Sequence, residues 1–518
     1  MDIFRLFESI PKIPNLPTIK KKEDLFKLKV IYPLIHGFAY AYIFWDPHSE
    51  ELRYYVIEPP LNEKEKEILE IVKDRLYDLV DIEVVNLDRK DAEKYIVEKI
   101  NQILKELNYH PKKSEYLKLV YYIIRDTIGL GKIEPLMHDP FIEDISCDGV
   151  GIPIFVYHSK YGSLKTNIIF NSNEELEKFV IKLAQKAGRY ISYAEPYLDG
   201  ILPDGSRVNA TYTSDITTRG PTFTIRKFRK EPWTPVDLIL NGTMNVDIAA
   251  YLWWAVEHKA NILIGGETGA GKTTLLNAIA MFIPKEAKVI SIEDTREIQL
   301  YHENWIPTVT REGFGPPDET GKRYGEVTMF DLLKESFRQR PDYVIVGEVR
   351  GKEAYVLFQG MASGHACMGT IHADSVTSVV RRLTTPPINL PIELIEHLDL
   401  FIFIVHAKEI SPSARRIKEV TEVTKVNYKY STVETNKAFV WDPENDTFVE
   451  SEIKELFKKL ARKRGFVLRD VREDIKERKE VLQWMVRNKI RDYREFTRIV
   501  NEFYVDKEKV LEKIYESS

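Results

Sequence analysis

Cysteine is scarce in this sequence of 518 residues, which contains only Cys147 and Cys367. Two cysteines exclude a disulfide framework, and within one chain they cannot supply a zinc site built from four thiolates. So few cysteines, far apart in the sequence, fit a protein of the reducing cytoplasm.

Long hydrophobic runs and an excess of positive charge are also missing. The closest approach to a membrane span, residues 398–405, is interrupted by Asp399 and is far shorter than the ~18 residues that cross a bilayer. Residues 1–5 lack the pattern of a signal peptide. The net charge is −5, so no overall basic field favours nucleic acid. We therefore expect a cytoplasmic protein that reaches a membrane through its surface or a partner.

The sequence does contain a phosphate-binding loop with the pattern GxxxxGK[ST]. This P-loop consists of Gly266, Glu267, Thr268, Gly269, Ala270, Gly271, Lys272 and Thr273. The apolar run 261–264 predicts a strand before it, and residues 274–280 predict a helix after it. Backbone N–H groups and the helix N-terminus would bind the phosphates, Lys272 adds a full positive charge, and the Thr273 hydroxyl can coordinate Mg²⁺. We include Thr274 in the predicted nucleotide site. A simple glycine turn would leave the Lys-Thr pair unexplained.

Apolar segments at 289–292, 343–346, 366–371 and 400–405 follow the P-loop and alternate with helical stretches. This alternation predicts an α/β domain over 236–450, with a mainly parallel sheet covered by helices on both faces.

Three further regions are expected around this domain. Residues 1–110 predict a small α+β interaction domain with a mobile lead-in, and residues 111–235 predict a second α+β domain. Residues 451–518 predict a helical appendage, because their apolar residues recur at helical spacing. The loop at 311–326, rich in glycine and proline, is either a lid or a surface insertion.

Two acidic residues lie at the ends of predicted strands. Glu293 follows the run 289–292, and Glu348 follows the run 343–346. The carboxyl ends of parallel strands border the ligand crevice, so both acids are expected beside the phosphates. Hydrolysis of a phosphoanhydride needs a carboxylate at the metal and a group that orients the water. Each acid alone is weak evidence, because charged residues commonly follow strands.

Two histidines, His365 and His372, bracket the strand predicted at 366–371. A shared zinc site is a poor interpretation because the strand separates them. One of them would better serve as a sensor of the γ-phosphate or as a subunit contact. A core or surface histidine is the alternative for either.

Four ordered segments of this sequence resemble motifs of the secretion ATPases that serve type II secretion, type IV pili and archaella. The P-loop resembles their Walker A motif, and residues 292–297 (IEDTRE) resemble their Asp box. Residues 340–350 (RPDYVIVGEVR) resemble Walker B, and residues 364–374 (GHACMGTIHAD) resemble the His box. Residues 141–145 and 202–209 also resemble the second N-terminal domain of that family. The missing four-cysteine zinc module of bacterial type II members favours the archaeal branch.

The resemblance implies roles for individual residues. Lys272 and Thr273 would hold phosphate and Mg²⁺, Glu293 would polarise the attacking water, and Glu348 would act on the metal or its water. The division of labour between the two glutamates stays open. His365 and His372 match the two His-box histidines.

Two arginines of the second N-terminal domain, Arg207 and Arg226, match positions that reach nucleotide, often across a subunit boundary. An arginine there offsets the charge of the transition state. Surface salt bridges are the equal alternative for both.

The implied protein is a homohexamer that hydrolyses ATP to ADP and phosphate between the second N-terminal domain and a RecA-like domain at 236–450. It would lie at the inner face of the cell membrane and push a polytopic platform protein, so that a pilus-like filament is assembled, secreted or rotated. Two rivals are a motor that translocates nucleic acid, for which no basic, aromatic channel is evident, and a scaffold gated by nucleotide. The sequence does not choose among archaellum, pilus and secretion system.

Overall fold

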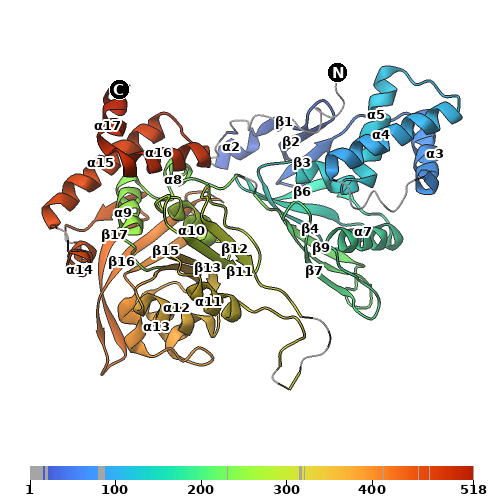
Figure 1. The fold of residues 1–518 in the computed structure, drawn as a ribbon. Helices are drawn as coiled ribbons and strands as arrows, with labels where there is room; N and C mark the ends of the chain where they lie inside the picture. Colours follow the sequence, from blue (N-terminus) through green and yellow to red (C-terminus); the bar gives the residue numbers. More distant parts are fainter. Residues whose placement is uncertain are drawn as a thin grey trace. The chain divides into compact units, whose positions relative to one another are not determined.

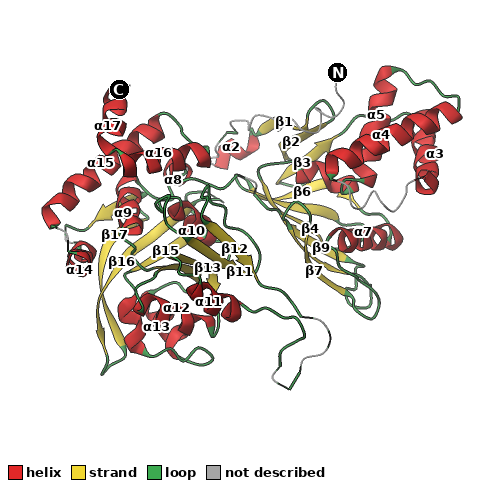
Figure 2. Ribbon diagram, in the orientation of Figure 1, coloured by secondary structure: helices red, strands yellow, loops and turns green. Residues whose placement is uncertain are grey.

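The computed structural model describes residues 16–17, 22–79, 88–229, 231–313, 315, 318–319, 321–411, 413–452, 454–465 and 467–516 (Figures 1 and 2). The chain divides into two compact units, residues 1–228 and 229–518. Each unit has its own sheet and its own hydrophobic core. Most of the expected lead-in, residues 1–15 and 18–21, lies outside the described residues.

In the described residues, the first unit contains a nine-stranded sheet with the order β1-β2-β3-β6-β5-β4-β9-β8-β7. Strands β3 and β6 are parallel, and the other neighbours are antiparallel. The strands are β1 (Lys29–Ile35), β2 (Ala39–Asp46), β3 (Glu51–Ile57), β4 (Ile142–Cys147), β5 (Pro153–His158), β6 (Gly162–Ile169), β7 (Tyr197–Ile201), β8 (Arg207–Thr211) and β9 (Thr222–Arg226). The helices are α2 (Lys22–Phe26), α3 (Glu63–Leu79), α4 (Arg89–Glu106), α5 (Lys113–Thr127), α6 (Glu134–Met137) and α7 (Asn173–Lys186), with a 3₁₀ turn η2 (Gly131–Ile133).

One face of this sheet is packed and the other is largely solvated. Residues along β6 and β8 alternate between buried and more exposed positions, as the period of two in a strand requires. The buried residues form one core with α3, α4, α5 and α7. The two regions expected before and after residue 110 therefore share one sheet and one core. The chain divides after Phe228, near the boundary expected at residue 235, and the finer division into four domains stays a prediction.

Two helices of the first unit begin with capping bonds from polar side chains. Before α3, the Asn62 side chain accepts from the Glu65 N–H at 2.9 Å, and the Glu65 carboxylate accepts from the Asn62 N–H at 2.8 Å. Before α7, the Ser172 hydroxyl accepts from the Glu175 N–H at 3.2 Å. These bonds satisfy N–H groups that have no partner within the helix.

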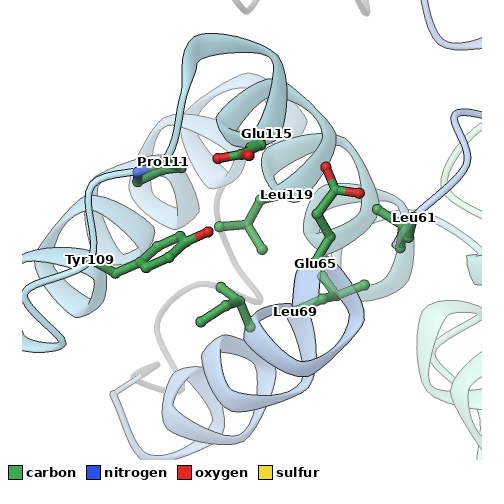
Figure 3. A pocket seen from close by; sticks show the side chains of 8 residues that line it. Leu61, Glu65, Leu69, Tyr109, Pro111, Glu115 and Leu119 are labelled. Carbon is green, nitrogen blue, oxygen red and sulfur yellow. The ribbon is translucent and has the colours of Figure 1, made fainter. Parts of the chain in front are cut away.

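A pocket in the first unit lies between α3 and α5 (Figure 3). Its carboxylates, Glu65 and Glu115, accept hydrogen bonds from the backbone N–H groups of Asn62 and Lys112. Glu65 is also paired with Lys118 at 3.0 Å. Both carboxylates cap the starts of helices, so a structural role accounts for their presence in the pocket.

The sheet of the second unit, in the described residues, has the order β12-β11-β13-β14-β10-β15-β16-β17-β18. The pairs from β12 to β15 are parallel, and those from β15 to β18 are antiparallel. The strands are β10 (Ile262–Gly266), β11 (Val289–Glu293), β12 (Trp305–Val309), β13 (Tyr343–Val349), β14 (Ala366–Ile371), β15 (Leu400–His406), β16 (Arg415–Asn427), β17 (Thr432–Asp442) and β18 (Thr447–Glu450). The helices are α8 (Pro235–Leu240), α9 (Val246–Glu257), α10 (Lys272–Ala280), α11 (Met329–Arg338), α12 (Glu353–Ala362), α13 (Val376–Thr384), α14 (Glu455–Arg464), α15 (Leu468–Arg487), α16 (Tyr493–Val505) and α17 (Lys507–Glu516), with a 3₁₀ segment η3 (Ile392–His397).

Helices cover both faces of the parallel strands, as predicted (Figure 1). Successive residues of β10 point to opposite sides, so Ile262 and Ile264 join the core beneath α9 and α10, whereas Leu263 joins the core beneath α11, α12 and α13. Both sides are buried, which explains why β10 and β14 read as continuous apolar runs. The helical C-terminal end is confirmed as α14 to α17. None of the helices in the described part of the chain has the length and hydrophobicity needed to span a bilayer.

Candidate functional site

The P-loop is the turn between β10 and α10, and its backbone requires glycine. Gly269 has a φ of +74° and Gly271 a φ of +94°, in the left-handed region that favours glycine. At Gly266 a Cβ would lie 2.5 Å from the backbone oxygen of Ile404 on the neighbouring strand β15. The turn therefore lies tightly against the sheet, with the N-terminus of α10 at its end.

Lys272, the first residue of α10, satisfies its ammonium group within the P-loop. Its Nζ donates to the backbone oxygens of Gly266 at 3.1 Å and Glu267 at 2.9 Å. The side chain is buried, and this desolvation lowers the lysine pKa below its usual value. A triphosphate bound in the loop would replace these neutral carbonyl acceptors with a charged one, a stronger hydrogen bond.

His372 lies between Lys272 and Glu348 at the carboxyl ends of β14 and β13. Its Nδ1 is 3.4 Å from Lys272 Nζ, and its Nε2 is 3.2 Å from Glu348 Oε1. An ammonium group only donates, so Nδ1 is the acceptor and the ring proton is on Nε2, which lies near Glu348 Oε1 without a hydrogen bond to it. The structure thus brings together Lys272, His372 and Glu348, three of the residues that the sequence predicts.

Arg350 is a member of this group that the sequence prediction missed. Its Nη2 donates to Glu348 Oε2 at 2.6 Å, and its Nη1 lies 3.5 Å from Asp294 Oδ2. It therefore connects the acidic segments that follow β11 and β13. Its position two residues after Glu348 was the available signal, since residues i and i+2 of an extended chain lie on one side. Arg350 and His372, together with Lys272, hold the pKa of Glu348 below its usual value despite burial.

Glu293, the last residue of β11, is held by the backbone of the next turn. Its Oε1 accepts from the N–H groups of Glu297 at 2.9 Å and Ile298 at 3.0 Å. Its Oε2 is buried and has no hydrogen-bond partner among the described residues. Burial raises the pKa of Glu293 to about 7, against the opposing effect of the two N–H groups. Such a carboxyl exchanges its proton near neutral pH, as a general base must.

Gly347 allows Glu293 to pack beside the strand that carries Glu348. A Cβ at Gly347 would lie 3.1 Å from Glu293 Cγ. Both predicted carboxylates therefore come to one edge of the sheet, the edge that also carries the P-loop. The groups at this edge suit a triphosphate with Mg²⁺. Lys272 and the N-terminus of α10 can bind phosphate, and the Thr273 hydroxyl and the two carboxylates can bind the metal or its water.

His365 is placed elsewhere. It precedes β14, whereas His372 follows it, so the length of the strand, roughly 20 Å for six residues, separates the two histidines. The ring of His365 packs edge-on against Phe337 at 4.9 Å between centroids. This separation excludes a zinc ion bound by both histidines, and His365 lies away from the edge that carries the P-loop.

Arg207 and Arg226 belong to the first unit, as opposed residues on β8 and β9. Arg207 Nη2 lies 2.8 Å from Asp199 Oδ2, and Arg226 Nε lies 3.4 Å from Asp144 Oδ1. These are the exposed salt bridges that formed the alternative interpretation. Their role toward nucleotide stays a prediction.

Comparison with known proteins shows the family to which the chain belongs. Residues 129–438 match the family described as Type II/IV secretion system protein. The chain belongs to that family. Residues 444–517 match the family described as PilB3-like, C-terminal. Membership makes this chain a nucleotide-binding secretion ATPase, and residues 129–438 include the P-loop and both carboxylates.

The chain is also similar to individual relatives and to solved structures. An uncharacterized protein of Methanocaldococcus jannaschii is 34% identical over 95% of this chain and 92% of its own length. A putative conjugal transfer protein of Mycobacterium tuberculosis is 28% identical over 52% of this chain and 76% of its own. The pilus retraction motor PilT, solved with bound ADP, is 20% identical, with 54% of this chain and 76% of that chain covered at a TM-score of 0.37.

Proposed function

We propose that this secretion ATPase hydrolyses ATP at the edge formed by the P-loop, Glu293 and Glu348, and that it powers a pilus-like filament system. The observation that carries the proposal is the short chain of contacts from Lys272 through His372 to Glu348, with Glu293 packed on the neighbouring strand. A P-loop lysine and two carboxylates are the parts that phosphoryl transfer to water requires.

The P-loop residues 266–274 bind and orient the triphosphate. Lys272 exchanges the carbonyls of Gly266 and Glu267 for phosphate oxygens, and the Thr273 hydroxyl and Glu348 would hold Mg²⁺ directly or through its water. When bound there, Mg²⁺ would offset negative charge on the phosphate oxygens. Glu348 exchanges its contact with Arg350 for that role, which leaves the guanidinium free to approach the phosphates.

Glu293 orients the attacking water and accepts its proton at Oε2. Its Oε1 stays fixed by the N–H groups of Glu297 and Ile298, so the carboxylate keeps its direction during the reaction. His372, between Lys272 and Glu348, senses the γ-phosphate through the change at both neighbours.

The assembly that we propose is a cytoplasmic homohexamer at the inner face of the cell membrane. In it, Arg207 and Arg226 leave their exposed carboxylate partners and reach nucleotide. The moving units would push a polytopic platform protein that assembles, secretes or rotates the filament. Family membership supports this proposal, because residues 129–438 match the family described as Type II/IV secretion system protein.

A phosphate-release assay with the Lys272→Ala protein tests the site. We expect turnover to fall at least ~100-fold, since removing one charge that stabilises the transition state costs this much or more. The control is Lys285→Ala, which removes an exposed lysine of the same unit and should leave turnover unchanged. Circular dichroism checks that both variants fold. Unchanged turnover in Lys272→Ala would refute the assignment.

The rival functions predict different results in the same assay. A motor on nucleic acid would be stimulated by added DNA, whereas our proposal predicts stimulation by vesicles that carry the platform protein. A scaffold gated by nucleotide would bind ATP and release no phosphate. Mass measurement with and without ATP tests the hexamer.

A further inference from the structure

The turn between β15 and β16 lies against the P-loop on the side away from the carboxylates. His406 ends β15, Arg415 begins β16, and the two residues are direct partners in the antiparallel ladder. The turn is closed by backbone bonds from Ala407 N–H to the Ala414 oxygen at 2.8 Å and from Ala414 N–H to the Ser411 oxygen at 3.1 Å. This closure fixes both side chains relative to β10, the parallel neighbour of β15.

Both side chains contact the phosphate-binding turn itself. Arg415 Nε donates to the backbone oxygen of Gly269 at 3.1 Å. A Cβ on Gly271 would lie 3.0 Å from Arg415 Cδ, and a Cβ on Gly269 would lie 3.5 Å from His406 Nε2. The glycines of the P-loop therefore leave room for these two side chains as well as for phosphate.

The order of the strands gives a bound nucleotide its direction. Along the edge, Glu348 on β13 and His372 after β14 lie on one side of the P-loop, and His406 on β15 lies on the other. The carboxylates and Lys272 attract Mg²⁺ and the γ-phosphate to the β13 side. The α-phosphate, ribose and base of the nucleotide must then extend toward β15 and β16.

The polarity of this wall suits that end of a nucleotide. Arg415 places a cation within the P-loop, where the α- and β-phosphates are negative. His406 Nδ1 is buried and has no hydrogen-bond partner among the described residues. Buried polar atoms without partners are rare, and a ligand group is one explanation for them. Because Nε2 lies at Gly269 and bonds its backbone, Nδ1 is the ring nitrogen left to accept a hydrogen bond from a ribose hydroxyl.

We propose that His406 and Arg415 form the nucleoside wall of the site, with His406 contacting the ribose and Arg415 holding both the Gly269 carbonyl and the α-phosphate. This inference rests on the proposed ATP site and adds the residues that recognise the nucleoside. It divides the ligand between two walls: β13 and β14 face the γ-phosphate, and β15 and β16 face the sugar.

Calorimetric titration of the full chain with ADP and with pyrophosphate, each with Mg²⁺, tests the proposal. Pyrophosphate fills the P-loop but has no nucleoside. In His406→Ala we expect ADP affinity to fall about tenfold, the effect of one lost hydrogen bond in a desolvated site, with pyrophosphate affinity unchanged within about twofold. In Arg415→Ala we expect both affinities to fall, because this side chain also shapes the loop. Lys425→Ala removes an exposed cation from the far end of β16 and should change neither.

The outcomes separate this inference from the proposed function. An equal loss of ADP and pyrophosphate affinity in His406→Ala would mean that His406 only supports the loop, and it would overturn the nucleoside wall. Unchanged affinities for both ligands would overturn it too. A wild-type chain that binds neither ligand would instead refute the ATP site on which the inference rests.

Discussion

The replacement of Glu293 by glutamine tests the catalytic assignment most sharply, because it changes charge and keeps shape. A glutamine oxygen can still accept from the N–H groups of Glu297 and Ile298, so the turn after β11 should keep its conformation. What is lost is the proton acceptor at Oε2. General-base catalysis contributes about 10²–10⁴-fold, so we expect kcat to fall by at least ~100-fold, or about 3 kcal/mol, with ATP affinity little changed.

The pH profile of the wild-type enzyme gives a second measure of the same residue. Burial raises the pKa of Glu293 to about 7. The base is inactive when protonated, so kcat/KM should rise with pH, with roughly a tenth of the carboxyls ionised one unit below the pKa and half at it. Steady-state phosphate release from about pH 5.5 to 8.5 measures the profile, and Glu303→Gln, which removes an exposed carboxylate of the same unit, is the matched control. A Glu293→Gln enzyme with a tenth or more of wild-type turnover would refute the reasoning. So would a profile that is flat below pH 7.

Two further substitutions test the packing around the site. Gly347→Ala places a methyl group 3.1 Å from Glu293 Cγ, so the carboxylate must shift. We expect kcat to fall about tenfold with KM unchanged. An unaltered kcat would contradict that contact. Arg478→Ala removes a buried guanidinium that forms ion pairs with Glu257 and Asp474. The free energy of unfolding of the second unit should fall by roughly 3 kcal/mol, because the two carboxylates lose this partner. Thermal unfolding measures the loss, with Arg472→Ala, a change at an exposed arginine, as the control. Equal melting temperatures for these two variants would exclude a stabilising role for Arg478.

The parallel part of the second sheet was predictable because its strands are buried on both faces. Continuous apolar runs such as 262–264 and 366–368 have no other common explanation beside a P-loop. Parallel pairing also brings the carboxyl ends of these strands to one edge, and with them Glu293 and Glu348. Those predictions depend on local patterns that keep their meaning in the fold.

Other features depend on contacts between distant segments. Strand β12 contains Pro307, and proline is unfavourable inside a sheet because it has no N–H to donate. It is tolerated here because β12 is an edge strand. The extension β16 to β18 was not predicted, nor was the approach of Arg415 to Gly269, 146 residues away. His365 looked equivalent to His372, but the two ends of a strand lie at opposite edges of the sheet. The single sheet of the first unit depends on the short pairing of β3 with β6.

The most direct test of the central claim is a structure of the full chain with Mg²⁺ and a non-hydrolysable ATP analogue. We predict that the triphosphate lies in the turn 266–273, with Lys272 Nζ moved from the Gly266 and Glu267 oxygens to a phosphate oxygen. Mg²⁺ should lie at the Thr273 hydroxyl, and Glu348 should have left Arg350 for the metal or its water. A triphosphate bound away from this turn, or Glu348 still paired with Arg350 beside a bound metal, would contradict the account.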